Sequence, residues 1–314
     1  MKLLNVCKEL ENLTRVAYDI DALNDAGLHN AKQLVRTSEK IYRDQVKRIA
    51  NVILTSKMKM VLVSGPSSSG KTTTSSIISQ ELLKKNVGSI VVSIDDFFIN
   101  LEDTPLLPDG TPDCENITAV DVEAFNKFFV DLLTKHKAKM PKFNFFTHKR
   151  EKWEDVTIND GDVLIVEGIH ALNPLLIRSH QFASSTYKIY AFTNSVFTLG
   201  DKIIMNAQDL RLMRRTFRDA YTRGREPIHT LNGWDKVCEG EKLYVAPYKI
   251  NANSVIETTH PYEILVYANY LLDLLIPYRN NEKAKKLINI LKKLTPLAKE
   301  IIPCKSLLWE FVAN

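Results

Sequence analysis

The pattern G-x-x-x-x-G-K-[ST] is matched at all four specified positions by Gly65-Pro66-Ser67-Ser68-Ser69-Gly70-Lys71-Thr72. An apolar run over residues 60–64 precedes this loop, and apolar residues at helical spacing over residues 72–85 follow it. Glycines let successive N–H groups point into one concavity, and a helix N-terminus adds partial positive charge. We therefore expect a phosphate-binding loop, with Lys71 reaching the β- and γ-phosphates and the Thr72 hydroxyl ligating Mg²⁺. A chance Ser/Gly-rich turn is the alternative, which the strand–helix context disfavours.

Carboxylates end two other apolar segments. Asp95 and Asp96 follow the run that starts at residue 89, and Glu167 follows residues 162–166. Ligands of open α/β sheets bind beyond the carboxyl ends of the strands, where a carboxylate can accept a hydroxyl proton or hold Mg²⁺. Because adjacent strand residues point to opposite faces, only one of Asp95 and Asp96 is expected to serve. A helix N-cap or a turn is the alternative for this pair.

Four arginines fall three and four residues apart and therefore share one side of a predicted helix: Arg211, Arg214, Arg215 and Arg218. Like charges this close repel one another unless an anion lies among them, and guanidinium groups bind phosphate oxygens in bidentate fashion. The cluster could stabilise charge on a transferring phosphoryl group. A solvated or nucleic-acid-binding face is the alternative. The lack of an interleaved base-stacking set and the nucleotide loop upstream favour the phosphate role.

Aromatic, histidine and basic residues are mixed over residues 141–150, which include Phe143 and His148. A lone histidine is usually structural, but aromatic faces beside polar donors also suit a planar ring such as a nucleobase. Residues 100–121 hold three prolines and a glycine and predict a long loop. Loops of this length in a compact domain are often functional.

Composition limits the classes of protein to consider. The chain of 314 residues has 45% hydrophobic and 25% charged residues, as is ordinary for a soluble globular protein. The net charge of +5 suits an anionic ligand but does not by itself indicate nucleic-acid binding. The four cysteines are far apart, which argues against a disulfide framework or a zinc site. Early charges exclude a typical signal peptide, and no apolar run reaches about 18 residues, so we expect a cytoplasmic location without a membrane anchor.

The expected fold is a three-layer α/β P-loop NTPase domain with a mostly parallel sheet and helices on both faces. We divide the chain into a helical N-terminal extension (1–57), a P-loop domain (58–275) and a C-terminal helical extension (276–314). Gly27 is expected to end a first helical unit, and a second helix is expected over residues 38–54. Residues 234–247 are expected to form a loop. The basic amphipathic helix over residues 282–294 is expected to dock on the domain, although a membrane-surface or partner-binding role is the alternative.

Taken together, these blocks resemble the uridine kinase and phosphoribulokinase family, and most closely its longer bacterial-type uridine kinase-like branch. The resemblance runs from about residue 57 to 275 and rests on the order and spacing of five blocks. They are Gly65–Thr72, Ser93–Phe98, Phe143–Arg150, Glu167–Ile169 and Arg211–Arg215 with Arg218-Asp219 and Arg223-Gly224. The resemblance implies phosphorylation of the 5′-hydroxyl of a pyrimidine nucleoside, uridine or cytidine, with ATP and Mg²⁺.

The same resemblance implies a role for each matching residue. Asp95 is the base that accepts the substrate hydroxyl proton, and Lys71, Arg215 and Arg218 assist catalysis. ATP is held by Gly65, Ser67, Ser68, Ser69, Gly70, Lys71, Thr72, Thr73, Arg214 and Arg223. The substrate contacts Asp95, Phe98, Phe143, His148 and Arg211, and the metal contacts Thr72 and Glu167.

Departures from the family pattern concern the acceptor more than the kinase chemistry. Phe98 and Phe143 stand where tyrosines are common, and His229-Thr230 lies where a base-reading amide is found. Two alternatives follow: a kinase for another small alcohol or a sugar phosphate, or a catalytically silent nucleotide-binding regulatory or RNA-associated protein. The expected partner is a small-molecule nucleoside, with no nucleic acid and no membrane. The resemblance also allows a homo-oligomer.

Overall fold

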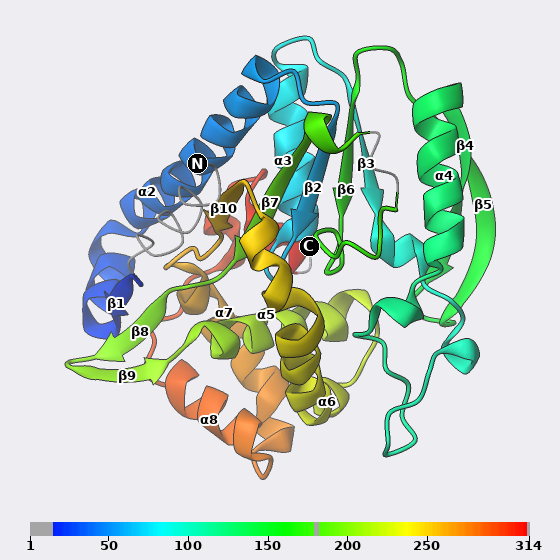
Figure 1. Ribbon diagram of the computed structural model, residues 1–314. Helices are drawn as coiled ribbons and strands as arrows, with labels where there is room; N and C mark the ends of the chain where they lie inside the picture. The colour runs from blue at the N-terminus through cyan, green and yellow to red at the C-terminus, as the bar shows by residue number, and fades with distance from the viewer. Residues whose placement is uncertain (1–14, 179–181, 313–314) are drawn as a thin grey trace.

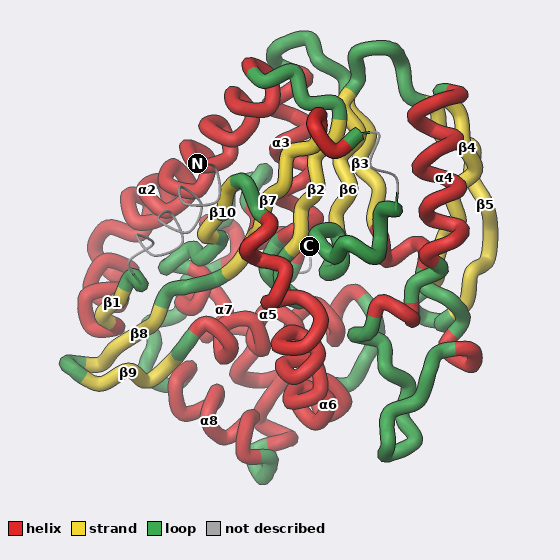
Figure 2. Tube along the Cα trace, viewed as in Figure 1, coloured by secondary structure: helices red, strands yellow, loops and turns green. Residues whose placement is uncertain are grey.

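The computed structural model describes residues 15–178 and 182–312. Its centre is a five-stranded sheet in the order β10-β7-β2-β6-β3, and every neighbouring pair is parallel. Figure 2 shows these strands side by side. They are β2 (Met60–Ser64), β3 (Ser89–Ser93), β6 (Val163–Glu167), β7 (Thr186–Phe192) and β10 (Ser254–Glu257). The strand before the phosphate loop, β2, is central and buried along its whole length, as its apolar run predicts.

Helices cover both faces of this sheet (Figure 1). Met60 and Leu62 of β2 face the core beneath α4 (Val122–Lys135), whereas Val61 and Val63 face the core beneath α2 (Ile20–Thr55) and α3 (Lys71–Leu83). The side-chain period of two in a strand sends alternate residues to opposite layers. The predicted three-layer α/β fold with a mostly parallel sheet is confirmed.

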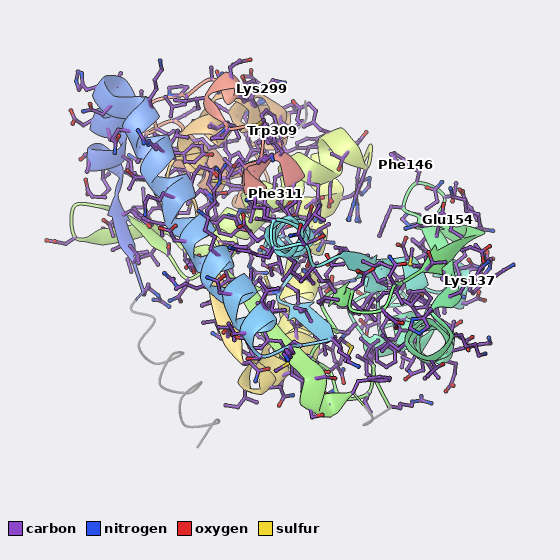
Figure 3. The ribbon with its side chains drawn as sticks, turned by 90° about the horizontal axis from the view of Figure 1, so that it is seen from above. Lys137, Phe146, Glu154, Lys299, Trp309 and Phe311 are labelled. Atoms are coloured by element: carbon purple, nitrogen blue, oxygen red, sulfur yellow. The ribbon has the colours of Figure 1, made fainter. Side chains whose placement is uncertain are left out.

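Two smaller sheets flank the main one. β4 (Lys137–Asn144) and β5 (Lys149–Thr157) form an antiparallel hairpin that packs beside α4. Lys137, Phe146 and Glu154 mark this hairpin in Figure 3. β1 (Ala17–Asp19), β8 (Val196–Leu199) and β9 (Lys202–Met205) form a separate three-stranded sheet. The aromatic and basic segment noted in the sequence thus belongs to the hairpin.

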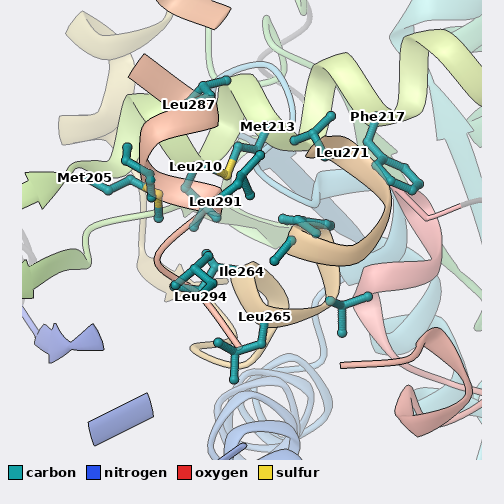
Figure 4. Close-up of a cluster of buried hydrophobic side chains, with 14 of the residues drawn as sticks. Met205, Leu210, Met213, Phe217, Ile264, Leu265, Leu271, Leu287, Leu291 and Leu294 are labelled. Carbon is teal, nitrogen blue, oxygen red and sulfur yellow. The ribbon is translucent and has the colours of Figure 1, made fainter. Parts of the chain in front are cut away.

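A second large core lies among the later helices (Figure 4). These helices are α5 (Ala207–Thr222), α6 (Pro227–Gly240), α7 (Glu263–Leu275) and α8 (Glu282–Leu291). Leu287 and Leu291 of α8 are buried there with Leu23 from the start of α2. The helix predicted over residues 282–294 therefore docks on the protein through its apolar side.

The N-terminal segment differs from the sequence prediction. The two expected helical units are present as two helices joined across a kink within α2, but Gly27 lies inside the first of them and does not end it. A Cβ built on Gly27 would lie 3.0 Å from a methyl carbon of Leu265, so this glycine permits close packing rather than a helix end. The non-helical backbone angles occur instead at Asn30, with φ −140° and ψ 32°. Ala17, expected in a helix, pairs with β8, and residues 1–14 lie outside the described residues.

The expected loop over residues 234–247 is also wrong. α6 continues to Gly240, and further helical turns run to Asn251. Trp234 and Val237 are buried in the second core, three residues apart on one side of the helix. The domain boundaries at residues 57 and 275 stay a prediction, because both terminal segments share cores with the middle of the chain. Within the described ranges, no helix combines the length and apolar character needed to cross a bilayer.

Candidate active site

The phosphate loop joins β2 to α3 at the carboxyl edge of the sheet. Gly65 has φ +151° and Gly70 has φ +82°, and a Cβ on Gly65 would lie 1.9 Å from the carbonyl oxygen of Ala191. Both positions therefore require glycine. Lys71 is the first residue of α3, so the free N–H groups of the first helical turn open at the loop.

Lys71 is almost fully buried, and its Nζ donates to the carbonyl oxygen of Pro66 at 3.0 Å. Burial lowers the pKa of its ammonium group, while the negative charges of Glu167 and Asp95 act in the opposite direction. Lys71 therefore lies among the two carboxylates that the sequence identified as candidates. A cation in this place can meet the phosphates of a nucleotide bound at the loop.

Thr72 and Glu167 are in direct contact, since the Thr72 hydroxyl donates to Glu167 Oε1 at 3.1 Å. Glu167 is the last residue of β6 and is 4% exposed. Burial, and then the nearby charge of Asp95, raise the pKa of Glu167 well above its usual range, against the effect of Lys71. The two oxygens are hard ligands of the kind that Mg²⁺ takes, and a bound cation would stabilise the ionised carboxylate.

The neighbours Asp95 and Asp96 differ in their contacts. Both lie in a short 3₁₀ helix (Ile94–Phe97) that begins where β3 ends. Asp96 forms an ion pair of 2.8 Å with Lys142 of β4, which fixes the hairpin to this turn. Asp95 instead lies near Lys71 and Glu167, as its effects on their pKa values show. Because Asp96 is already paired with Lys142, Asp95 is the better candidate of the two for chemistry at the loop.

Three arginines of α5 hold the phosphate loop itself. Arg211 donates to the carbonyl oxygen of Ser67 at 3.1 Å, and Arg215 donates to the Ser67 hydroxyl at 2.9 Å. Arg214 reaches the carbonyl oxygen of Ser68 at 3.3 Å. The predicted arginine-bearing side of the helix is therefore present, and it contacts the phosphate loop.

Two of these arginines are already paired within the protein, and the roles expected for them in ATP and substrate binding stay predictions. Arg214 is fully buried and forms a two-pronged ion pair with Glu263 of α7, at 2.7 and 2.8 Å. Arg211 is 3% exposed, is paired with Glu241, and lies over the ring of Trp234. Both guanidinium groups are paired with a carboxylate and bonded to the backbone of the loop, so the contacts that the structure shows for them are ones that position the loop.

The arginines further along α5 surround one buried carboxylate, Asp219. Arg215, Arg218 and Arg223 lie 3.4, 3.5 and 3.4 Å from it. Burial alone would raise the pKa of Asp219, but the three guanidinium groups outweigh burial and lower it. Burial and the charge of Arg218 lower the pKa of Arg223 to about 10, against the effect of Asp219. Asp219 thus holds together charges that would otherwise repel.

A cleft of about 600 Å³ lies between the phosphate loop, α5 and the hairpin. Thr72, Phe143, Arg218 and Arg223 line it together with aromatic residues of the hairpin turn. The guanidinium of Arg223 lies 4.4 Å from the ring centre of Phe145. This volume is typical of small-ligand sites, and the lining offers aromatic faces beside cations.

Other predicted substrate residues lie further from this cleft. His148 is exposed at the hairpin turn with φ +55° and does not line the cleft. Its carbonyl oxygen accepts from the backbone of Leu101, so the backbone of His148 holds the hairpin in place. Phe98 packs edge-on against Phe143, with ring centres 5.8 Å apart, and thereby supports the residue that lines the cleft.

Three acidic residues near the loop were not assigned a role from the sequence: Glu115, Asp219 and Glu310. Glu115 is largely buried 3.7 Å from Arg215, and burial raises its pKa despite that charge. The spacing of the arginines could have pointed to a counter-ion such as Asp219 on the same helix. No local pattern marks Glu310, because it lies more than two hundred residues from the loop it contacts.

Comparison with known proteins identifies the family to which the chain is similar. Residues 60–264 match the phosphoribulokinase / uridine kinase family. Uridine kinase-like protein 3 of Arabidopsis thaliana is 26% identical over 196 residues, or 62% of this chain and 38% of that protein. Uridine kinase of Mycoplasma genitalium is 26% identical over 229 residues, or 72% of this chain and 96% of that protein. A solved structure of a possible uridine kinase from Bacillus stearothermophilus has a TM-score of 0.39 and 21% identity, covering 47% of this chain and 79% of that one.

The match spans little more than a third of the length of the plant relative but nearly all of the mycoplasma relative. The family match itself runs unbroken from β2 to the start of α7. It thus includes the phosphate loop, the two strand-end carboxylates and the arginine-rich helix. The family resemblance expected from five sequence blocks is confirmed, and the chain belongs to the phosphoribulokinase / uridine kinase family.

Proposed function

We propose that this protein is an ATP-dependent kinase that phosphorylates the 5′-hydroxyl of a pyrimidine nucleoside, uridine or cytidine. One observation carries the proposal: Thr72, hydrogen-bonded to Glu167, lines the same cleft as Phe143 and Arg218. A phosphate-binding helix start and an aromatic acceptor wall therefore share one cavity. Membership in the family supports the class of reaction.

The residues divide into holding and reacting roles. Lys71 and the loop amides hold the phosphates of ATP, while Thr72 and Glu167 hold Mg²⁺, which offsets phosphate charge when bound. Asp95 orients the acceptor hydroxyl and takes its proton. Arg215 and Arg218 offset negative charge near the transferring group. Such an in-line transfer depends mainly on positioning and electrostatics.

The donor set suits Mg²⁺ bound partly by nucleotide. Among the described residues, no group of three or more His, Cys, Asp or Glu side chains is placed to hold a metal ion. Mg²⁺ in kinases usually takes one or two protein oxygens and completes its shell with phosphates and water. A threonine hydroxyl beside one buried carboxylate fits that requirement.

The charges in the cleft favour a neutral acceptor. Each of its basic residues faces a carboxylate within 4 Å: Lys142 with Asp96, Lys152 with Glu154, and both Arg218 and Arg223 with Asp219. A phosphorylated acceptor would have to compete with these existing partners. A nucleobase can instead lie against the aromatic rings, which needs no additional positive charge.

A second candidate, a kinase for another small alcohol, is favoured by one observation. Phe98 and Phe143 pack against each other and present an apolar surface where family members often carry tyrosine hydroxyls. Fewer hydroxyl donors near the acceptor weaken the argument for base-specific contacts. A catalytically silent nucleotide-binding or RNA-associated protein is disfavoured by the presence of Lys71, Thr72, Asp95 and Glu167.

The deciding experiment measures ADP release from Mg-ATP with a panel of acceptors. The panel contains uridine, cytidine, purine nucleosides, ribulose 5-phosphate and pantothenate, with Lys71→Ala as the blank. Turnover with uridine or cytidine alone supports the proposal. Turnover only with ribulose 5-phosphate or pantothenate contradicts the proposal and supports the second candidate, a kinase for another small alcohol or a sugar phosphate. ATP binding without turnover on any acceptor contradicts both.

A further inference from the structure

A segment near the C-terminal end packs directly on the phosphate loop. Leu307 and Phe311 are fully buried in the core that α2 and α3 form with the sheet. A methyl carbon of Leu307 lies 2.6 Å from where a Cβ on Gly70 would be, and the Phe311 ring lies 4.9 Å from the guanidinium carbon of Arg214. Figure 3 shows Phe311 close to α3, seen end-on. The backbone of residues 307–311 is therefore held against the loop.

Between these two anchors, Glu310 reaches the start of α3. Its Oε2 accepts a hydrogen bond of 3.0 Å from the backbone N–H of Thr73. Thr73 is the third residue of α3, so this N–H is one of the first-turn donors without a partner inside the helix. Glu310 also lines the cleft together with Thr72. A carboxylate from the C-terminal segment thus lies at the phosphate-binding end of the loop helix.

We propose that Glu310 competes with the nucleotide phosphates for the N-terminus of α3, so that nucleotide binding must displace its carboxylate. The inference rests on the proposed function, because it takes the loop as a nucleotide site. Two anions cannot share one N–H donor, and like charges at hydrogen-bonding range repel. The side chain can leave by rotation, since the backbone anchors are Leu307 and Phe311. Glu310 therefore lowers nucleotide affinity while it keeps the helix start satisfied.

The purely structural alternative gives a different result. If Glu310 only caps α3, replacing its charge changes stability and leaves nucleotide affinity where it was. If Glu310 instead helps to bind Mg²⁺ or the nucleotide, the replacement weakens binding. Competition alone predicts that the loss of this carboxylate strengthens nucleotide binding.

The test measures the dissociation constants of Mg-ADP and Mg-ATP by calorimetry for the wild type, Glu310→Gln and Glu310→Ala. Glu300→Gln, at an exposed glutamate that precedes this segment, is the matched control. We expect Glu310→Gln to bind nucleotide roughly 3- to 30-fold more tightly, because the interaction free energy of a carboxylate with a helix N-terminus corresponds to about this range. The gain should shrink with added salt. Glu300→Gln should stay within about twofold of the wild type, since exposed charges contribute little.

Melting temperatures without nucleotide check that each variant folds. If Glu310→Ala proves unstable, the result is taken from the near-isosteric Glu310→Gln. Unchanged or weaker nucleotide binding in a folded Glu310→Gln protein overturns the inference and leaves the proposed function standing. If neither the wild type nor Glu310→Gln binds nucleotide, the proposed function fails, and this inference fails with it. Tighter binding that Lys71→Ala abolishes in the same background supports both.

Discussion

Asp95 and Asp96 show how much adjacent residues can differ in use. The sequence presents two equivalent carboxylates at the end of one strand. In the fold, Lys142 neutralises Asp96, while Asp95 lies among the charges of the phosphate loop. The choice between them depends on a lysine of the hairpin, which no local pattern around residue 95 reveals.

We predict that Asp95→Asn lowers kcat by roughly 10²- to 10⁴-fold, the usual contribution of a positioned general base. ADP affinity should change by less than about threefold, because Asp95 is assigned to the acceptor side. The matched control is Asp96→Asn, which breaks the ion pair with Lys142 and should act mainly on KM through the hairpin. Near-wild-type turnover in Asp95→Asn would remove Asp95 from the mechanism.

His170 gives a prediction about pH. It is 1% exposed, and burial lowers its pKa to about 4, although backbone groups of Glu115 and Asn116 act in the opposite direction. A histidine whose pKa is lower in the fold than its unfolded value of about 6.5 contributes stability that is complete above that value. The contribution is lost as the pH falls from about 6.5 towards 4, and its full size is roughly 3 kcal/mol.

Urea unfolding of the wild type and of His170→Gln at pH 7.5, 6.0 and 5.0 tests this. The difference in unfolding free energy between the two proteins should shift in favour of His170→Gln as the pH falls. His260, which is also buried with a lowered pKa, remains in both proteins and cancels. A constant difference between the wild type and His170→Gln across this range would contradict the prediction.

At the scale of elements, α5 connects the phosphate loop to the second core. One side of the helix contacts the loop through Arg211, Arg214 and Arg215. Its apolar residues, including Leu210, Met213 and Phe217, pack against α7 and α8. The spacing of the arginines predicted the helix and its charged face. It could not predict which arginines would be buried, because that depends on Glu263 and Glu241 in other helices.

We predict that Arg214→Met destabilises the protein by about 3 to 5 kcal/mol, because it leaves the fully buried Glu263 without its cation. The double variant Arg214→Met/Glu263→Gln should recover part of this loss, since the unpaired charge is gone. Unfolding in urea gives both values. Arg279→Met, at an exposed arginine, should stay within about 0.5 kcal/mol of the wild type. Equal losses in the single and double variants would show that the charge pairing is not the cause.

Elements with strong local patterns were predictable, and those set by distant contacts were not. The sequence predicts β2, α3 and β6 because each buries an apolar run or stripe. The hairpin β4–β5 was not predicted, because most residues of β5 are exposed and carry charges. The break within α2 was placed at Gly27 because glycine usually weakens a helix, whereas the kink lies at Asn30 and the missing side chain of Gly27 makes room for Leu265. The phosphate loop, Glu167 and the arginine helix were identified, but their contacts with the C-terminal segment were not.

On the scale of the whole molecule, α2 and the segment of residues 307–311 both pack against the phosphate loop or the helix that follows it. Tyr42 of α2 hydrogen-bonds Thr74 of α3 at 2.8 Å, and Leu307 packs on Gly70. Both of these segments therefore support the site, wherever the domain boundaries are placed. Local patterns cannot predict such support, because the partners lie outside one another's local sequence.

We predict that Leu307→Ala destabilises the protein by about 2 to 5 kcal/mol, as expected when a fully buried leucine leaves a cavity. It should also weaken nucleotide binding, because the cavity opens beside Gly70 of the loop. Thermal and urea unfolding measure the loss of stability, and titration with Mg-ADP measures the loss of nucleotide affinity. The control is Leu243→Ala at a leucine that is 56% exposed, where both effects should be small. A stable Leu307→Ala protein would show that the C-terminal segment packs only loosely.

The buried pair of Arg214 and Glu263 also limits how the molecule can move. With α5 joined to α7 through this pair and to the loop through Ser68, rotating the helix as a rigid lid would break all of these bonds together. Any opening or closing of the cleft must therefore come from movement of its outer wall. There Gly224, with φ +59°, follows α5 beside Phe146, and Arg223 lies over Phe145. The rate of substrate and product exchange would then depend on local rearrangements of that wall rather than on rotation of whole helices.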